Sequence, residues 1–181
     1  MSNGLSVVAE SDEKIGPDKI GSGIPVGATL RAKIGWIEIR CDDAAITQCY
    51  WRKIEPKVVV SSPLAEEAKN QVAAYLEGRL TRFDLPLSYP GTDFVVSVWE
   101  MLLRIPYGET RRYGHLATLL GKGDYTDARA VGTACGQNPI AIIIPCHRVV
   151  GSNALGGYSS DLGLTAKRYL LDLEKGQGRL F

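Results

Sequence analysis

The alternation of apolar and polar residues in the first third of the chain predicts a β-hairpin. Apolar side chains recur with a two-residue period in residues 32–39 and again in residues 46–51. Asp42-Asp43 lies between the two runs, and aspartate favours turns because its side chain bonds nearby backbone groups. A third strand is expected either before the hairpin, at residues 28–31, or after it, at residues 57–60.

A helix is predicted to begin just after the hairpin. Ser62 is a good N-cap, Pro63 suits the first helical position, and Gly78 ends the helix. One apolar face is expected on this helix, formed by Leu64, Ala68, Val72 and Leu76.

The second half of the chain predicts three further helices. Thr92 is expected to cap a helix through Arg104, whose buried stripe is Phe94, Val98, Leu102 and Ile105. Two short helices, at residues 113–120 and 126–135, are joined by a glycine-containing turn, which is typical of a helix-turn-helix. Many helical hairpins do not bind DNA, so this pattern alone leaves the function open.

After the third helix, Asn138-Pro139 stops helical propagation and is expected to begin a strand-like run to Ile144. The side chain of Asn138 can bond backbone groups on both sides of this turn.

These elements predict a two-domain α/β protein. Residues 27–78 would form an N-terminal domain with a small antiparallel sheet and a helix, and residues 92–181 a C-terminal helical domain. Residues 79–91 contain two prolines and are expected to be a linker. Residues 1–26 are rich in Gly, Ser, Asp and Lys without periodicity, which favours a flexible tail.

Composition and charge narrow the classes of function. In 181 residues no apolar stretch approaches the ~20 needed to span a bilayer, and the start of the chain lacks the features of a signal peptide. We therefore expect a soluble cytoplasmic protein, or a nuclear one in a eukaryote. A net charge of +1 argues against a nonspecific polycation. A local basic cluster is expected in the second half, from Arg111, Arg112, Lys122, Arg129 and Arg148.

The four cysteines are scattered and do not form a disulfide framework. Zinc is an alternative for Cys41 and Cys49, but only His115 and His147 could complete such a site and no Cys-x2-Cys spacing occurs. A disulfide between Cys41 and Cys49 is another alternative, although a hairpin turning at Asp42-Asp43 would not set them opposite each other. No metal site is predicted.

The most informative segment is Ile144-Pro145-Cys146-His147-Arg148-Val149. A thiol is nucleophilic only as the thiolate, and imidazole or cationic neighbours lower its pKa. The segment therefore predicts an activated cysteine at position 146. The alternative is a structural cysteine beside a surface His-Arg pair.

Three further segments accompany this motif in order: Arg129-Ala130-Val131-Gly132 before it, then Gly156-Gly157-Tyr158-Ser159, and Glu174. From residue 35 to residue 176, and densely from Phe94, the chain resembles the O6-alkylguanine-DNA alkyltransferases. The resemblance implies direct-reversal DNA repair, in which an alkyl group moves irreversibly from O6 of guanine, or O4 of thymine, in duplex DNA to Cys146. It also implies a cofactor-free monomer that reacts once, with a ribonuclease H-like first domain and a winged-helix-like second domain.

The resemblance assigns roles to the site residues. Cys146 would be the nucleophile, His147 would take its proton through a water, and Glu174 would orient His147. Tyr113 would polarise the flipped base and push the 3′ phosphate. The residues implied to bind or support the substrate are Asn138, Val149, Tyr158 and Ser159.

The helix at residues 126–135 is rich in small residues, which would let its backbone approach a groove closely. By resemblance it lies in the minor groove, where Arg129 fills the space of an extruded nucleotide. The small residues expected at this surface are Ala128, Ala130, Gly132, Thr133 and Ala134.

One segment departs from the family pattern. Where two glycines usually follow Tyr158-Ser159, this chain has Ser160-Asp161 and about two extra residues before Lys167, which leaves the width of the pocket open. Two rival functions remain. A noncatalytic lesion-binding protein of the same fold would lack the acceptor cysteine. A cysteine hydrolase would need direct pairing of Cys146 with His147, which is awkward for adjacent residues on an extended strand.

Overall fold

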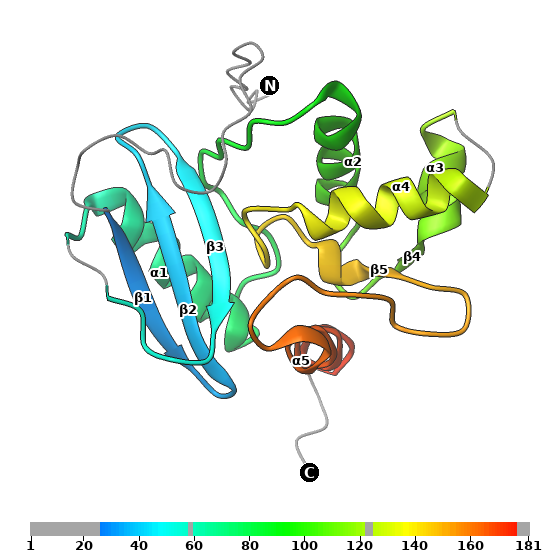
Figure 1. Cartoon of the computed structure of the whole chain (residues 1–181). Helices are drawn as coiled ribbons and strands as arrows, with labels where there is room; N and C mark the ends of the chain where they lie inside the picture. Colours follow the sequence, from blue (N-terminus) through cyan, green and yellow to red (C-terminus); the bar gives the residue numbers. More distant parts are fainter. Residues whose placement is uncertain (1–25, 58–59, 122–124, 177–181) are drawn as a thin grey trace.

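A three-stranded antiparallel sheet dominates the first half of the molecule (Figure 1). The computed structural model describes residues 26–57, 60–121 and 125–176. Strand β1 spans Gly27–Ala32, β2 spans Gly35–Cys41 and β3 spans Ile46–Arg52, in the order β1-β2-β3. The predicted hairpin and the strand before it are confirmed. The first run of alternation is not one strand, however, because residues 33–34 form a turn between β1 and β2.

Some predictions fall outside the described residues. The expected flexible tail lies there except for Val26, which bridges to Val60. The alternative strand at 57–60 is described only at its two ends, and the predicted turn at 121–124 only at Gly121.

The turn between β2 and β3 is built by Asp42. Its carboxylate accepts hydrogen bonds from the backbone N–H groups of Ala44 (2.8 Å) and Ala45 (2.7 Å), as expected of an aspartate turn. The two-residue period then places Ile37, Ile39 and Trp51 on the buried face of the sheet.

Helix α1 (Pro63–Leu76) covers that buried face (Figure 1). Its start is as predicted, because the Ser62 hydroxyl accepts a hydrogen bond from the Ala65 N–H at 3.1 Å. The predicted apolar face is rotated by about one position, since Leu64 and Leu76 are only half-buried. The residues that reach the core are Ala65, Ala68, Val72 and Tyr75.

The segment at residues 79–91 runs along the edge of β3. Ile46 donates its N–H to the Pro86 carbonyl (2.8 Å), and Ser88 donates to the Ile46 carbonyl (2.9 Å). Leu85 and Tyr89 are buried. The expected linker is therefore attached to the sheet by backbone hydrogen bonds.

Helices form most of the second half, together with two short parallel strands. The helices are α2 (Asp93–Leu103), α3 (Tyr113–Leu119), α4 (Tyr125–Gly136) and α5 (Gly163–Lys175), and the strands are β4 (Arg111–Arg112) and β5 (Val149–Val150). The predicted helices are confirmed within about one residue, but the Thr92 side chain makes no capping hydrogen bond. Trp99 was not predicted in the core, where its Nε1 donates to the Ala134 carbonyl at 2.8 Å.

The strand-like run predicted before the cysteine is not a strand. Ile140 makes an isolated bridge to Cys49, the Ile144 N–H donates back to the Ile140 carbonyl (2.9 Å), and Ile142 has a φ of 76°. The side chain of Asn138 closes this loop by donating to the Ile144 carbonyl (2.8 Å) and accepting from the Ile140 N–H (3.0 Å). The run is apolar because it is buried on all sides, and such a run has no period that separates strand from loop.

The four cysteines are free and buried. The disulfide alternative is therefore wrong, and the register explains why: Cys49 lies opposite Ile39, and Cys41 lies opposite Ile46. Among the described residues, no group of three or more His, Cys, Asp and Glu side chains could hold a metal ion. None of the helices in the described ranges is long and apolar enough to cross a membrane.

Candidate active site

Cys146 lies at the start of a 3₁₀ turn, η1 (Cys146–Arg148), and is only 6% exposed. Burial raises the pKa of its thiol, and this outweighs the hydrogen bond from Asn138 and the charge of Lys167, which lower the pKa. The expected lowering of the thiol pKa by its neighbours is therefore wrong for the free protein, because burial outweighs them. A buried thiol needs a base to become a nucleophile.

His147 is fully buried and holds a defined orientation. Its Nε2 lies 2.8 Å from Glu174 Oε1, whereas its Nδ1 has no hydrogen-bond partner among the described residues. Burial lowers the pKa of His147, although the bond to Glu174 opposes this effect. A neutral ring that donates Nε2–H to the carboxylate carries its lone pair on Nδ1.

Glu174, near the end of α5, receives hydrogen bonds from several elements. Its donors are His147, Tyr75 Oη (2.6 Å), Arg148 Nε and Nη2 (3.0 and 2.9 Å) and the Gly108 N–H (3.0 Å). Burial alone would raise the pKa of Glu174, but the hydrogen bonds from His147 and Arg148 lower it far below its usual range. The residue is thus a fixed negative charge.

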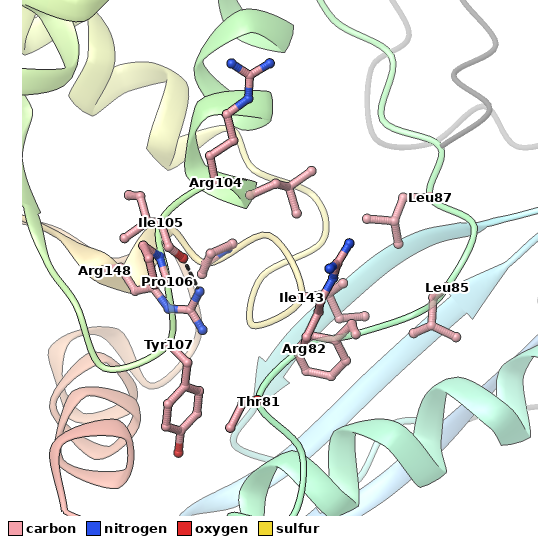
Figure 2. Close-up of a pocket in the computed structure, with 13 residues that line it drawn as sticks. Thr81, Arg82, Leu85, Leu87, Arg104, Ile105, Pro106, Tyr107, Ile143 and Arg148 are labelled. Carbon is pink, nitrogen blue, oxygen red and sulfur yellow. Dashed lines mark hydrogen bonds between the residues drawn. The ribbon is translucent and has the colours of Figure 1, made fainter. Parts of the chain in front are cut away.

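Arg148 is buried and makes structural hydrogen bonds. Besides its fork to Glu174, its Nη1 donates to the Ile105 carbonyl at 2.6 Å, as Figure 2 shows. It cannot belong to the basic surface cluster expected from the sequence, because only 7% of it is exposed. Arg148 and Pro145 help to line a cavity of about 480 Å³ (Figure 2), whose lining includes neither Cys146 nor His147.

Lys167 is a site residue that the sequence analysis missed. It is fully buried, and its Nζ donates to the carbonyls of Val149 (2.6 Å) and Gly157 (3.1 Å). Within the described ranges it forms no ion pair with a carboxylate. Burial lowers the pKa of Lys167, while the thiol of Cys146 raises it. Its seven-residue spacing from Glu174, which puts both on one helical face, was the available signal.

Tyr113, the first residue of α3, links the helix pair to the loop after β5. Its hydroxyl lies 3.5 Å from Lys167 Nζ. A Cβ on Gly156, where φ is 72°, would lie 2.7 Å from the Tyr113 ring, and one on Gly132 of α4 would lie 3.9 Å away. Burial raises the pKa of Tyr113 well above its usual range. The hydroxyl therefore keeps its proton and can donate it.

The loop at residues 156–161 passes close to the end of α4. The Ser159 hydroxyl would lie 3.4 Å from a Cβ on Gly136. Burial raises the pKa of Tyr158 well above its usual range, and the charge of Cys146 adds to this effect. Asp161 belongs to the segment that departs from the family pattern, and it attaches this loop to the sheet. Its carboxylate forms an ion pair with Arg52 (3.7 Å) and accepts a hydrogen bond from the Lys53 N–H (3.4 Å).

Helix α4 exposes part of the surface that was predicted for DNA. Arg129 and Thr133 are exposed one turn apart, and Ala128, Ala130 and Gly132 are half-buried. The prediction for Ala134 is wrong, because it is buried under Trp99. The exposed strip is therefore narrower than the small residues suggested.

The structure thus brings together the predicted residues Cys146, His147, Glu174 and Asn138, and joins Val149 to Tyr113 through Lys167. A thiol next in sequence to a buried base, and close to two packed helices, suits a protein that brings its own nucleophile to a nucleic acid. Residues 93–176 match the family described as 6-O-methylguanine DNA methyltransferase, DNA binding domain.

Curated relatives extend this match beyond the second half. The methylated-DNA–protein-cysteine methyltransferase of Methanosarcina acetivorans is 43% identical over 154 residues, covering 81% of this chain and 96% of the relative. The chain therefore belongs to the methylated-DNA–protein-cysteine methyltransferase family. The Mycobacterium tuberculosis protein of the same name is 55% identical over 109 residues, which cover 60% of this chain and 64% of that relative. The matched part thus spans just under two thirds of the mycobacterial protein.

Solved structures agree with this assignment. The Mycobacterium tuberculosis OGT structure in complex with DNA has a TM-score of 0.71 and 43% identity, covering 81% of this chain and 91% of that one. The α/β fold, with its small antiparallel sheet and helical second half, is therefore the fold of these proteins.

Proposed function

We propose that this chain repairs DNA by transferring an alkyl group from O6 of guanine, or O4 of thymine, in duplex DNA to Sγ of Cys146. The observation that carries the proposal is the state of His147. Its Nε2 is held by Glu174 at 2.8 Å, and its Nδ1 is left without a partner among the described residues. A base in this state, next in sequence to the thiol, is placed to receive a proton.

The thiol proton passes to His147 Nδ1 through a water, and Glu174 stabilises the resulting imidazolium. The turn at η1 supports this indirect route, because the rival hydrolase mechanism needs a direct contact between the thiol and the imidazole, and no hydrogen bond joins the Cys146 thiol to the His147 ring in the described structure. The thiolate then attacks the alkyl carbon. An S–C bond forms, the C–O bond breaks, and the electron pair remains on the base.

Tyr113 donates its hydroxyl proton to the departing base or shares it in a hydrogen bond. Lys167 Nζ lies 3.5 Å from that hydroxyl and stabilises the negative charge that develops on the Tyr113 oxygen. The carbonyls of Cys146 and Val149 accept from the exocyclic amine of guanine. The Val149 carbonyl already accepts from Lys167, but a carbonyl oxygen has two lone pairs. The Ser159 backbone meets the guanine oxygen, and Tyr158 walls the pocket.

Access to a buried thiol requires the base to leave the duplex. Helix α4 lies in the minor groove, with Ala128, Ala130 and Gly132 allowing close approach, and Arg129 fills the vacated space. Tyr113 contacts the 3′ phosphate. The exposure of Arg129 at the middle of α4 supports this role.

Several finer assignments are part of the same proposal. The first domain, residues 27–78, is ribonuclease H-like, and the second, residues 92–181, is winged-helix-like, with 79–91 between them. The protein acts as a monomer without a cofactor. Its four free thiols suit a reducing compartment, such as the cytoplasm or the nucleus.

Intact-protein mass spectrometry tests the proposal. After incubation with a duplex containing one O6-methylguanine, we expect a single added methyl, located by peptide mapping on Cys146. Cys146→Ser should bind the duplex and gain no mass, whereas Cys135→Ser, which replaces another buried cysteine, should react normally. Binding of the wild-type protein without any mass gain would instead assign it to the noncatalytic lesion-binding proteins.

A further inference from the structure

A tyrosine from the N-terminal half reaches the proposed relay. Tyr75 lies in the last turn of α1 and is fully buried. Its hydroxyl lies 2.6 Å from Glu174 Oε1 and 3.3 Å from His147 Nε2. The residues are 99 and 72 positions apart in the sequence, so the sheet-and-helix half of the molecule contributes directly to the His147–Glu174 pair.

The position of this hydroxyl is fixed by packing. The Tyr75 ring contacts Tyr107 edge-on, with centroids 5.9 Å apart, and Phe83 at 5.2 Å. Phenylalanine would fill the same space, so packing alone does not require a hydroxyl here. Burying a hydroxyl is unfavourable unless it is hydrogen-bonded, and the bond that compensates is the one to Glu174.

We propose that Tyr75 is a positioning residue for alkyl transfer. Its hydroxyl donates a hydrogen bond to Glu174 Oε1 and so weakens the attraction between Glu174 and a proton on His147, which keeps His147 neutral. The proposal rests on the roles assigned above to Cys146, His147 and Glu174. The role proposed for Tyr75 gives the N-terminal half of the molecule a part in the chemistry, because this hydrogen bond to Glu174 comes from α1.

The two distances decide how the hydroxyl acts. At 2.6 Å the bond to Glu174 is short and involves a charge, whereas 3.3 Å to His147 is long for a hydrogen bond between these atom types. Tyr75 therefore acts mainly as a donor to the carboxylate. A hydrogen bond to an ionised carboxylate disperses its charge, so removing the donor makes Glu174 a stronger partner for imidazolium.

The other groups around His147 are the Cys146 thiol and Arg148 on either side in sequence, and Glu174 and Lys167 from α5. The two cations disfavour a second positive charge on His147, and Glu174 favours it. Tyr75, from α1, changes the strength of the one group that favours protonation. Its loss should therefore raise the pKa of His147.

The test compares Tyr75→Phe with Tyr107→Phe. Both variants remove one buried hydroxyl from neighbouring rings, but the Tyr107 hydroxyl has no hydrogen-bond partner among the described residues. The chain has only two histidines, so ¹⁵N-histidine NMR titrations are simple to assign. His115 is exposed and serves as the internal reference.

In Tyr75→Phe we expect the His147 titration to move to higher pH, while His115 stays in place and Tyr107→Phe titrates like the wild type. The acid limb of the rate of alkyl transfer from free O6-benzylguanine should move with His147. An unshifted His147 in folded Tyr75→Phe would overturn the proposal. If no variant transfers an alkyl group at all, the proposed function fails while the His147 titration still decides the role of Tyr75.

If Tyr75→Phe does not fold, the same histidine titration is measured on wild-type protein grown with 3-fluorotyrosine. Fluorination makes the hydroxyl a stronger donor, so the His147 titration should move to lower pH, again with His115 unchanged. No movement of His147 in that protein would also overturn the proposal.

Discussion

Lys167 donates a 2.6 Å hydrogen bond to the Val149 carbonyl from a fully buried position, with no carboxylate partner among the described residues. Such a charge is costly to bury unless a negative charge lies nearby. The Cys146 thiol can supply one, since each group's charge shifts the other's pKa toward ionisation, and its effect on Lys167 is larger than that of Cys135. Forming the thiolate therefore completes a charge pair inside the site.

Lys167→Met should slow alkyl transfer at pH 7 by about tenfold, equivalent to roughly 1.4 kcal/mol of lost stabilisation. The loss of the cation raises the pKa of the Cys146 thiol, so the rate should recover as the pH is increased. Rates with O6-benzylguanine between pH 6 and pH 9 measure this. Arg168→Met, which removes an exposed cation from the next position, should leave the profile unchanged. A deficit that persists at pH 9 would contradict a role of Lys167 in forming the thiolate.

How much of this site the sequence could predict depends on how far apart in the sequence the contacting residues lie. The Ser62-Pro63 helix start, the turn at Asp42 and the dual bonding of Asn138 follow from interactions within a few residues, and all three are present. The segment at residues 140–144 was wrongly expected to be a strand, because a run buried on every side carries no period.

Tyr75 and Lys167 could not be predicted in the same way. Tyr75 lies outside the apolar face predicted for its helix, and Lys167 was named only as the residue that follows an insertion. Their roles come from hydrogen bonds to residues 99 and 18 positions away in the sequence. The resemblance identified Cys146, His147 and Glu174, but composition and spacing do not specify that the end of α1 packs against them. The net effect of burial on the Cys146 thiol also needs the three-dimensional surroundings.

Arg129→Ala should separate base extrusion from chemistry. We expect transfer from a duplex to fall by about 10- to 100-fold, since unstacking a base costs a few kcal/mol, and transfer from free O6-benzylguanine to change by less than about twofold. Single-turnover rates on both substrates provide the measurement. Arg82→Ala, an exposed arginine of the 79–91 segment, is the control. Equal slowing on both substrates would show that Arg129 acts on the site itself.

Glu174→Gln should destabilise the fold, because Arg148 would then be buried without its counter-charge. Breaking a buried pair costs about 3–5 kcal/mol, and a chain of this size loses about 2–4 °C of melting temperature per kcal/mol. The hydrogen bonds from His147 and Arg148 hold the pKa of Glu174 below its unfolded value.

The stability that Glu174 contributes is therefore fully present above the unfolded pKa, about 4.3, and is lost as the pH falls toward the folded value. The gap between wild type and Glu174→Gln should be constant from about pH 5.5 to pH 8 and should shrink below about pH 4. Urea unfolding across this range measures it. A gap that is constant down to pH 3 would show that the carboxylate is not ionised selectively in the folded state.

Gly156 and Gly157 provide a matched pair of substitutions beside Tyr113. A Cβ at position 156 would lie 2.7 Å from the Tyr113 ring, and the φ of 72° there is unfavourable for alanine, whereas a Cβ at position 157 would meet nothing within 4 Å. Gly156→Ala should therefore displace Tyr113, lower the melting temperature by an amount equivalent to about 1–3 kcal/mol, and slow alkyl transfer by about tenfold or more. Gly157→Ala should change stability by less than about 0.5 kcal/mol. Thermal melts and O6-benzylguanine rates on both variants distinguish the two positions. Equal behaviour of the two variants would mean that the close approach of Gly156 to Tyr113 does not position the hydroxyl for the reaction.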